Sequence, residues 1–152
     1  MPIKFRKPTI EDADLYFNWA NDPLVRENSF EQKTISYDDH VRWFKQKLDS
    51  PDCYFYLFEN QNKPIGQVRI ERKSENVIGI SIDKDSRGKG FGPIMLEMSC
   101  KHFLELYPNQ IIYAYIKSAN EASQKIFRKA GFTNNLELII NNVPSIKLSK
   151  TN

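Results

Sequence analysis

Three of the six glycines in the chain stand within five residues, at Gly88, Gly90 and Gly92, soon after the apolar run 76–83. Glycine allows positive φ angles and lets a ligand approach the main chain closely. Pro93 suits the first turn of a helix, because the N–H groups of that turn have no helical partner. Those free N–H groups and the helix dipole favour a bound anion. The stretch is therefore either an anion-binding loop or a simple strand-to-helix turn.

Two widespread phosphate loops do not fit this spacing. A Walker loop that begins at Gly88 requires a second glycine at the position of Pro93. A dinucleotide loop of the G-x-G-x-x-G type requires glycine at the same position and fails in the same way. Arg87 and Lys89 still add positive charge beside the glycines, so a different anionic ligand remains compatible with the sequence.

The composition limits the classes of partner. The chain has 152 residues and a formal net charge of +3, and its Lys and Arg residues are spread along its length. A nucleic-acid-binding protein usually carries a clustered basic face, so we expect no nucleic-acid partner. The length suits one domain with a substantial core. The oligomeric state stays open, with a homodimer among the possibilities.

Cysteine and histidine usage argues against a metal site. Cys53 and Cys100 lie far apart, and the chain has two histidines with no zinc-ligand spacing.

The N-terminal residues 1–9 lack an apolar signal core, and no run approaches the length of a membrane span. We therefore expect a cytoplasmic protein with reduced thiols, no metal and no membrane association.

Hydrophobic periodicity predicts elements along the whole chain. Strands are expected at 3–7, 53–59, 64–71, 76–83, 110–116 and in two arms around a turn at 141–142. Helices are expected after Thr9, Ser36, the glycines and Asn120, and 24–30 is expected to be irregular. The order β-α-α-β-β-β-α-β-α-β-β predicts one α/β (α+β) domain over 1–152, with a mixed sheet of about seven strands and helices on both faces. Pro144 is expected to restrict its strand to an edge or a bulge.

The glycine stretch resembles a known cofactor loop. Read as R-x-x-G-x-G, Arg87, Gly90 and Gly92 match the acetyl-CoA pyrophosphate loop of the GNAT N-acetyltransferases, whose pattern is Q/R-x-x-G-x-G/A between a strand and a helix. A second GNAT signature follows some thirty residues later. Its pattern N-x-x-A/S…G-F is matched by Asn120, Ser123 and Gly131-Phe132.

The resemblance implies a GNAT fold whose sheet is splayed between the fourth and fifth strands. Acetyl-CoA would lie in that opening, with its pantetheine arm paired to the main chain of Ile80, Ser81 and Ile82. Its pyrophosphate would lie on the amides of Arg87, Gly88, Lys89, Gly90, Phe91, Gly92 and Pro93.

The second signature would border the acyl end of the donor. Asn120 would reach the pantetheine arm or cap its own helix, and Ser123 would lie beside it. Many GNAT enzymes have a tyrosine seven residues after the asparagine, where this chain has Phe127. A phenyl ring can pack against the thioester but cannot donate a proton. Tyr115 is the next candidate for the general acid, with core packing as its alternative role.

Amide formation also requires an oxyanion donor and a base. The resemblance implies the backbone N–H of Ile82 as the oxyanion donor. Relatives often place a glutamate where this chain has Val77, so the base is left to Glu71, Glu75 or His40, with water relaying the proton. His40 has a suitable intrinsic pKa.

The N-terminal half resembles one branch of the family, which acetylates the 4-amino group of UDP-linked deoxyamino sugars. The matching residues are Trp19, Asn21, Pro23, Val25, Arg26, His40 and Trp43, and Ala20 replaces the usual arginine. The resemblance implies that Trp19, Arg26, Asn28 and His40 contact a nucleotide-sugar acceptor, although core packing or capping would also explain them. Protein N-terminal or other small-amine acetylation, and a non-catalytic acyl-CoA-binding module, are the alternative functions.

Overall fold

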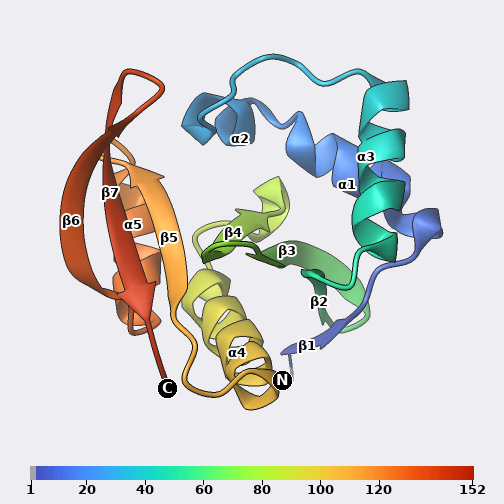
Figure 1. Ribbon diagram of the computed structural model, residues 1–152. Coiled ribbons are helices and arrows are strands. Elements are labelled where there is room, and N and C mark those ends of the chain that lie inside the picture. The colour runs from blue at the N-terminus through green and yellow to red at the C-terminus, as the bar shows by residue number, and fades with distance from the viewer. Residues whose placement is uncertain (1–2) are drawn as a thin grey trace.

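The computed structural model describes residues 3–152 and contains a seven-stranded sheet in the order β1-β2-β3-β4-β5-β7-β6 (Figure 1). The strands are β1 (Ile3–Arg6), β2 (Cys53–Asn60), β3 (Lys63–Arg72), β4 (Asn76–Ile82), β5 (Ile112–Lys117), β6 (Thr133–Ile140) and β7 (Val143–Lys150). The helices are η1 (Ile10–Asp12), α1 (Ala13–Ala20), α2 (Pro23–Asn28), α3 (Tyr37–Asp49), η2 (Lys84–Ser86), α4 (Phe91–Leu106) and α5 (Glu121–Lys129).

The sheet divides into two antiparallel parts that meet at one short parallel contact. Strands β1 to β4 form a meander, and β5, β7 and β6 form the second part. Only Asn76–Ile112 and Val77–Tyr113 are in register between β4 and β5. Beyond Val77 the two strands diverge, as the green and orange strands of Figure 1 show. The expected mixed sheet and its splay between the fourth and fifth strands are confirmed.

Alternation along the strands divides the core into two layers. Val68 and Ile70 of β3 are fully buried on the side that also holds Met95 and Phe103 of α4. On the opposite side, Leu57 and its neighbours on β2 pack with residues of α1 and α3. Figure 1 accordingly shows α1 and α3 on one side of β2–β4 and α4 on the other.

Two expectations about local structure are wrong. Residues 23–28 form helix α2 instead of an irregular segment, because the Asp22 carboxylate accepts hydrogen bonds from the N–H groups of Leu24 and Val25. Strand β7 lies between β5 and β6, although Pro144 was expected to confine it to an edge or a bulge. Pro144 is tolerated because it precedes Ser145, the residue at which register pairing with β5 ends.

Within residues 3–152, no helix is both long and apolar enough to cross a membrane. The same part of the chain contains no group of three or more His, Cys, Asp or Glu side chains placed to hold a metal ion.

Candidate functional site

A cavity of about 1340 Å³ occupies the gap between β4 and β5. Two groups of elements form its walls. One wall consists of α1, α2, the start of α3 and the exposed faces of β3 and β4. The other consists of β5, the glycine loop and the first turns of α4 and α5. We call this cavity the cleft.

The free edge of β4 faces the cleft. Asp83 donates its N–H to the Ile65 carbonyl of β3 (2.8 Å). Because backbone groups alternate in direction along a strand, the N–H and C=O of Ile82 point the other way, into the gap. Consistent with this, Arg87 Nε donates to the Ile82 carbonyl (3.1 Å) from that side. The N–H groups of Ile80 and Ile82 are thus free to bind a ligand strand or an oxyanion.

The glycine loop opens towards the same space. Gly88 and Gly90 have φ angles of 75° and 80°, and a Cβ atom on either would meet no atom within 4 Å. Gly90 is the N-cap residue of the 16-residue helix α4 and has no side chain to bond its first-turn N–H groups. This open, uncapped helix start fits the pyrophosphate of acetyl-CoA. Of the seven loop residues expected to bind it, only Lys89 does not line the cleft.

Two side chains attach the loop to the N-terminal helices. Arg87 forms an ion pair with Asp22 at the start of α2 (NH2 to Oδ1, 3.0 Å). Burial raises the pKa of Asp22, but the Arg87 guanidinium outweighs it and the net pKa lies below its usual range. Trp19 donates its indole N–H to Asp83 Oδ1 (2.9 Å). This ion pair and this hydrogen bond connect the wall formed by α1 and α2 to the end of β4.

The residues of the second signature lie on the opposite wall. The Asn120 side chain accepts a hydrogen bond from the Ser123 N–H (3.1 Å) and so caps α5. Phe127 is buried and packs edge-on against Phe132, with ring centroids 5.1 Å apart. Asn120, Ser123 and Phe127 all line the cleft.

The candidate proton donors and acceptors differ in their surroundings. Tyr115 lines the cleft, but its hydroxyl bonds Glu75, which also pairs with Lys147. Burial, followed by the bond to Glu75, raises the pKa of Tyr115. The structure does not bring Glu71 to the cleft. Its carboxylate is paired with Lys47 (2.7 Å), Arg69 (3.0 Å) and Lys73 (3.4 Å).

His40 does line the cleft, where it is 2% exposed. Its ring contacts the rings of Phe17, Trp43 and Phe44, and its Nε2 atom has no hydrogen-bond partner within residues 3–152. Burial among these aromatic rings lowers the pKa of His40, so the imidazole is neutral near pH 7.

Arg26 and Asn28 also line the cleft, on α2. The Arg26 guanidinium holds the segment after α2 in place. It donates to the carbonyls of Glu31 (2.9 Å) and Lys33 (3.2 Å) and to Ser29 Oγ (3.3 Å). Its Nε atom is buried and has no partner in the described chain. Most of its donors therefore serve the protein.

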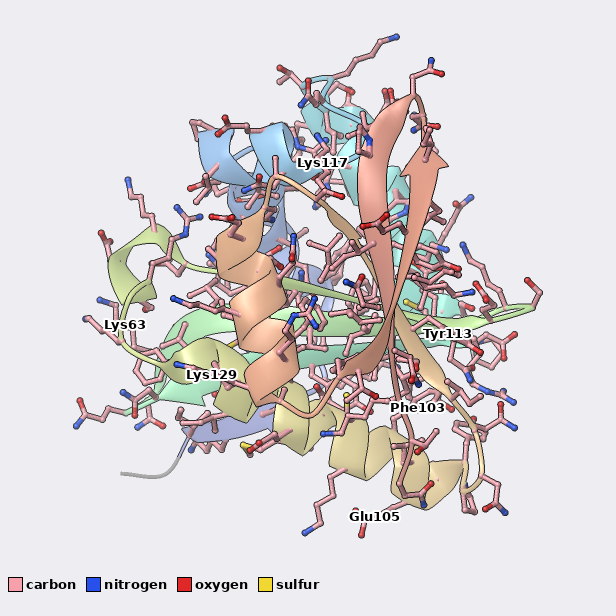
Figure 2. All side chains as sticks on the ribbon, turned by 90° about the vertical axis from the view of Figure 1, so that its left-hand side faces the viewer. Lys63, Phe103, Glu105, Tyr113, Lys117 and Lys129 are labelled. Carbon is pink, nitrogen blue, oxygen red and sulfur yellow. The ribbon has the colours of Figure 1, made fainter. Side chains whose placement is uncertain are left out.

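Gln67 and Lys117 are among the cleft residues that the sequence did not predict. Gln67 of β3 donates from Nε2 to Ser81 Oγ (3.2 Å). Lys117, at the end of β5, donates to the Glu27 carbonyl of α2 (2.8 Å). Figure 2 shows the label of Lys117 beside the blue N-terminal helices. Neither residue belongs to a motif. Only the alternation of β3 places Gln67 on the same face as Arg69, and this signal is too weak to indicate a site.

The sequence of residues 3–133 matches the family model described as the acetyltransferase (GNAT) domain. The chain belongs to this family. It is an acetyl-CoA-dependent N-acetyltransferase. No curated protein matches the chain in sequence.

Solved structures show the same fold at low sequence identity. A spermidine N-acetyltransferase from Vibrio cholerae, in complex with CoA and spermine, is 17% identical, with a TM-score of 0.87 over 97% of this chain and 94% of that one. The aminoglycoside acetyltransferase AAC(6')-Ib, with coenzyme A, is 16% identical, with a TM-score of 0.81 over 99% and 95%. An N-acetyltransferase from Staphylococcus aureus Mu50 is 18% identical, with a TM-score of 0.80 over 99% of each chain.

Proposed function

We propose that this N-acetyltransferase acetylates the 4-amino group of a UDP-linked deoxyamino sugar. The charge of the cleft is the observation that carries the proposal. Its basic lining residues are Arg26, Arg69, Arg87, Lys117, Lys125 and Lys129, and Glu121 is the single acidic residue among the described residues that line it. Such a cleft attracts an anion on both walls.

Part of this charge is available to the acceptor. Lys125 and Lys129 lie on α5, beside the expected donor, and Arg87 and Arg69 are paired with carboxylates. Arg26 and Lys117 bond backbone carbonyls and form no ion pair within residues 3–152. Lys117 Nζ bonds α2, the helix that also carries Arg26, so both full positive charges lie at this part of the cleft, where a diphosphate would be favoured.

The same lining disfavours a polycationic acceptor. The Vibrio cholerae relative is a spermidine acetyltransferase, and AAC(6')-Ib acts on aminoglycosides. A polyamine or an aminoglycoside carries several ammonium groups, which need carboxylates to replace their hydration. The wall formed by α1, α2, α3, β3 and β4, which we call the acceptor wall, has no acidic residue among its described lining residues. The carboxylates of Asp22 and Glu71 are paired with Arg87 and Lys47.

The proposed mechanism is direct attack of the amine on the thioester in a ternary complex. Acetyl-CoA supplies the acetyl group with a thiol as leaving group, whose pKa of about 8.5 requires little acid assistance near neutral pH. The Ile82 N–H would stabilise the negative charge on the carbonyl oxygen. Phe127 cannot donate a proton, and the Tyr115 hydroxyl is held by Glu75. We therefore expect the thiolate to leave without a side-chain acid.

Release of CoA from acetyl-CoA, measured with a panel of amines, tests the acceptor. We expect turnover with a UDP-4-amino-4,6-dideoxy sugar at least about 100-fold higher in kcat/KM than with spermidine, kanamycin or a peptide N-terminus. Preference for the peptide would replace the proposal with N-terminal acetylation. Tight acetyl-CoA binding without turnover of any amine would leave only the acyl-CoA-binding function.

A further inference from the structure

On the acceptor wall, side chains of helix α3 contact side chains of strand β3 in the same order along both elements. Lys47 Nζ lies 2.7 Å from Glu71 Oε2, and the Arg69 guanidinium lies over the Trp43 ring, 4.9 Å from its centroid. One helical turn advances about 5.4 Å and two strand residues advance about 6.6 Å. Successive turns of α3 therefore match successive residues on this face of β3.

The next residues in this order are Gln67 of β3 and His40 of α3. Gln67 is in register with Leu57, which belongs to the core beneath α1 and α3, so its side chain lies on the face covered by α3. Both Gln67 and His40 line the cleft. Each ends in a buried polar atom with no partner in the described chain, Oε1 of Gln67 and Nε2 of His40.

Buried polar atoms are nearly always hydrogen-bonded, so two unpaired atoms at matched positions point to a ligand that completes them. The Gln67 amide is fixed because its Nε2 donates to Ser81 Oγ (3.2 Å), which leaves Oε1 as an acceptor only. His40 is neutral among aromatic rings, and with its proton on Nδ1 the Nε2 atom offers a lone pair. Two acceptors in the lining of the same cleft match a group that carries several N–H donors.

The location of this pair also suits the reaction. Gln67 is in register with Ser81, the residue before Ile82, whose N–H faces the gap. A group held by Gln67 therefore lies next to the strand edge at which the thioester is expected. This edge is reached from the acceptor wall, so the group belongs to the acceptor and not to the donor.

We propose that Gln67 and His40 hold the reacting amino group, with Gln67 Oε1 and His40 Nε2 each accepting one of its N–H bonds. The nitrogen lone pair then forms the amide bond to the acetyl carbon while the carbon–sulfur bond breaks. One N–H proton passes to His40 Nε2, the thiolate takes up one proton, and His40 returns its own to solvent. A neutral amine and a thioester thus give an amide and a free thiol.

This inference rests on the acetyl transfer but not on the identity of the acceptor, because the pair touches only the amino group. Steady-state kinetics of Gln67→Leu and His40→Gln test it with whichever amine of the panel the wild type prefers. We expect kcat/KM for the amine to fall about 10- to 100-fold in each variant, while KM for acetyl-CoA stays within about twofold. Gln67→Glu keeps an oxygen at the same place, so it should retain more activity than Gln67→Leu.

Two matched variants separate this role from folding. Gln46→Leu makes the same change on the exposed face of α3, and His102→Gln changes the other histidine, which bonds Tyr56 on the opposite side of the sheet. Both should keep wild-type kinetics. The inference is overturned if Gln67→Leu lowers amine and acetyl-CoA parameters equally, if it matches Gln46→Leu, or if the wild type acetylates no amine. Preference for spermidine or a peptide would refute the nucleotide-sugar proposal while the variants still test the amine site.

Discussion

Gly90 combines a positive φ of 80° with open space around the position of a Cβ atom. Its role at the loop can be tested with two side chains of nearly equal size. Asparagine tolerates positive φ and is neutral, whereas aspartate adds a negative charge where the pyrophosphate would lie. We expect Gly90→Asp to weaken acetyl-CoA binding at least about 10-fold more than Gly90→Asn, as measured by calorimetry. Equal affinities in the two variants would contradict the assignment of the loop.

His40 also affects the pH dependence of stability. Its pKa is lowered by burial in the folded protein, so the unfolded chain binds the proton more tightly. Stability is therefore complete above about pH 6.5 and declines as the pH falls towards the folded pKa. Between about pH 7.5 and 5.5, Tm should fall more in the wild type than in His40→Gln. His102→Gln should retain the wild-type decline, and an unchanged slope in His40→Gln would contradict this account.

At the scale of elements, α4 and α5 are held close together by the absence of a side chain at Gly92. A Cβ atom there would lie 2.8 Å from Ile126 Cγ2, on the facing helix. Gly92→Ala should therefore destabilise the protein by about 1–3 kcal/mol in urea unfolding, although alanine favours a helix. In an Ile126→Ala background, which removes Cγ2, the same substitution should cost much less. Additive effects of the two changes would argue against this contact.

The elements also show what the sequence can predict. Regular alternation and helix-start signals were enough for most of the order of strands and helices. The donor loop was predicted from the resemblance of Arg87, Gly90 and Gly92 to the GNAT loop, and it stays a prediction. Helix α2 was missed because Asn21-Asp22-Pro23 ends one helix and begins the next, so one signal served two elements. The first turn of α2 is capped by the Asp22 carboxylate. In the sequence, the same residue stands in an Asn-Asp-Pro group that is typical of a turn.

The acceptor wall was less predictable for a different reason. Gln67 and Lys117 acquire their roles from contacts with residues distant in sequence, such as Ser81 and Glu27. A single polar residue in a strand has no spacing that distinguishes a ligand from a solvated side chain. Glu71 is the opposite case. The sequence made it a candidate base, but in the structure its carboxylate is paired with Lys47 outside the cleft.

At the scale of the whole molecule, the basic cleft predicts a dependence on salt. Arg26 and Lys117 would attract a diphosphate, and added salt screens such attraction. We expect KM for the UDP-amino sugar to rise several-fold between about 0.05 and 0.5 M NaCl. Lys117→Gln should raise KM at low salt and reduce this dependence. A salt-independent KM in the wild type would contradict the anionic acceptor.

The gap between β4 and β5 has a consequence for the balance between stability and activity. Only two register pairs join the two parts of the sheet, so Ile80 and Ile82 leave backbone groups that no other strand pairs. Each such hydrogen bond would contribute about 0.5–1.5 kcal/mol if the strands continued side by side. A chain in which β4 and β5 stayed paired along their length would be more stable, but it would lose the gap in which the donor is expected to bind. The sheet is thus left incomplete at β4, and we expect the donor to bind there in the manner of an added strand.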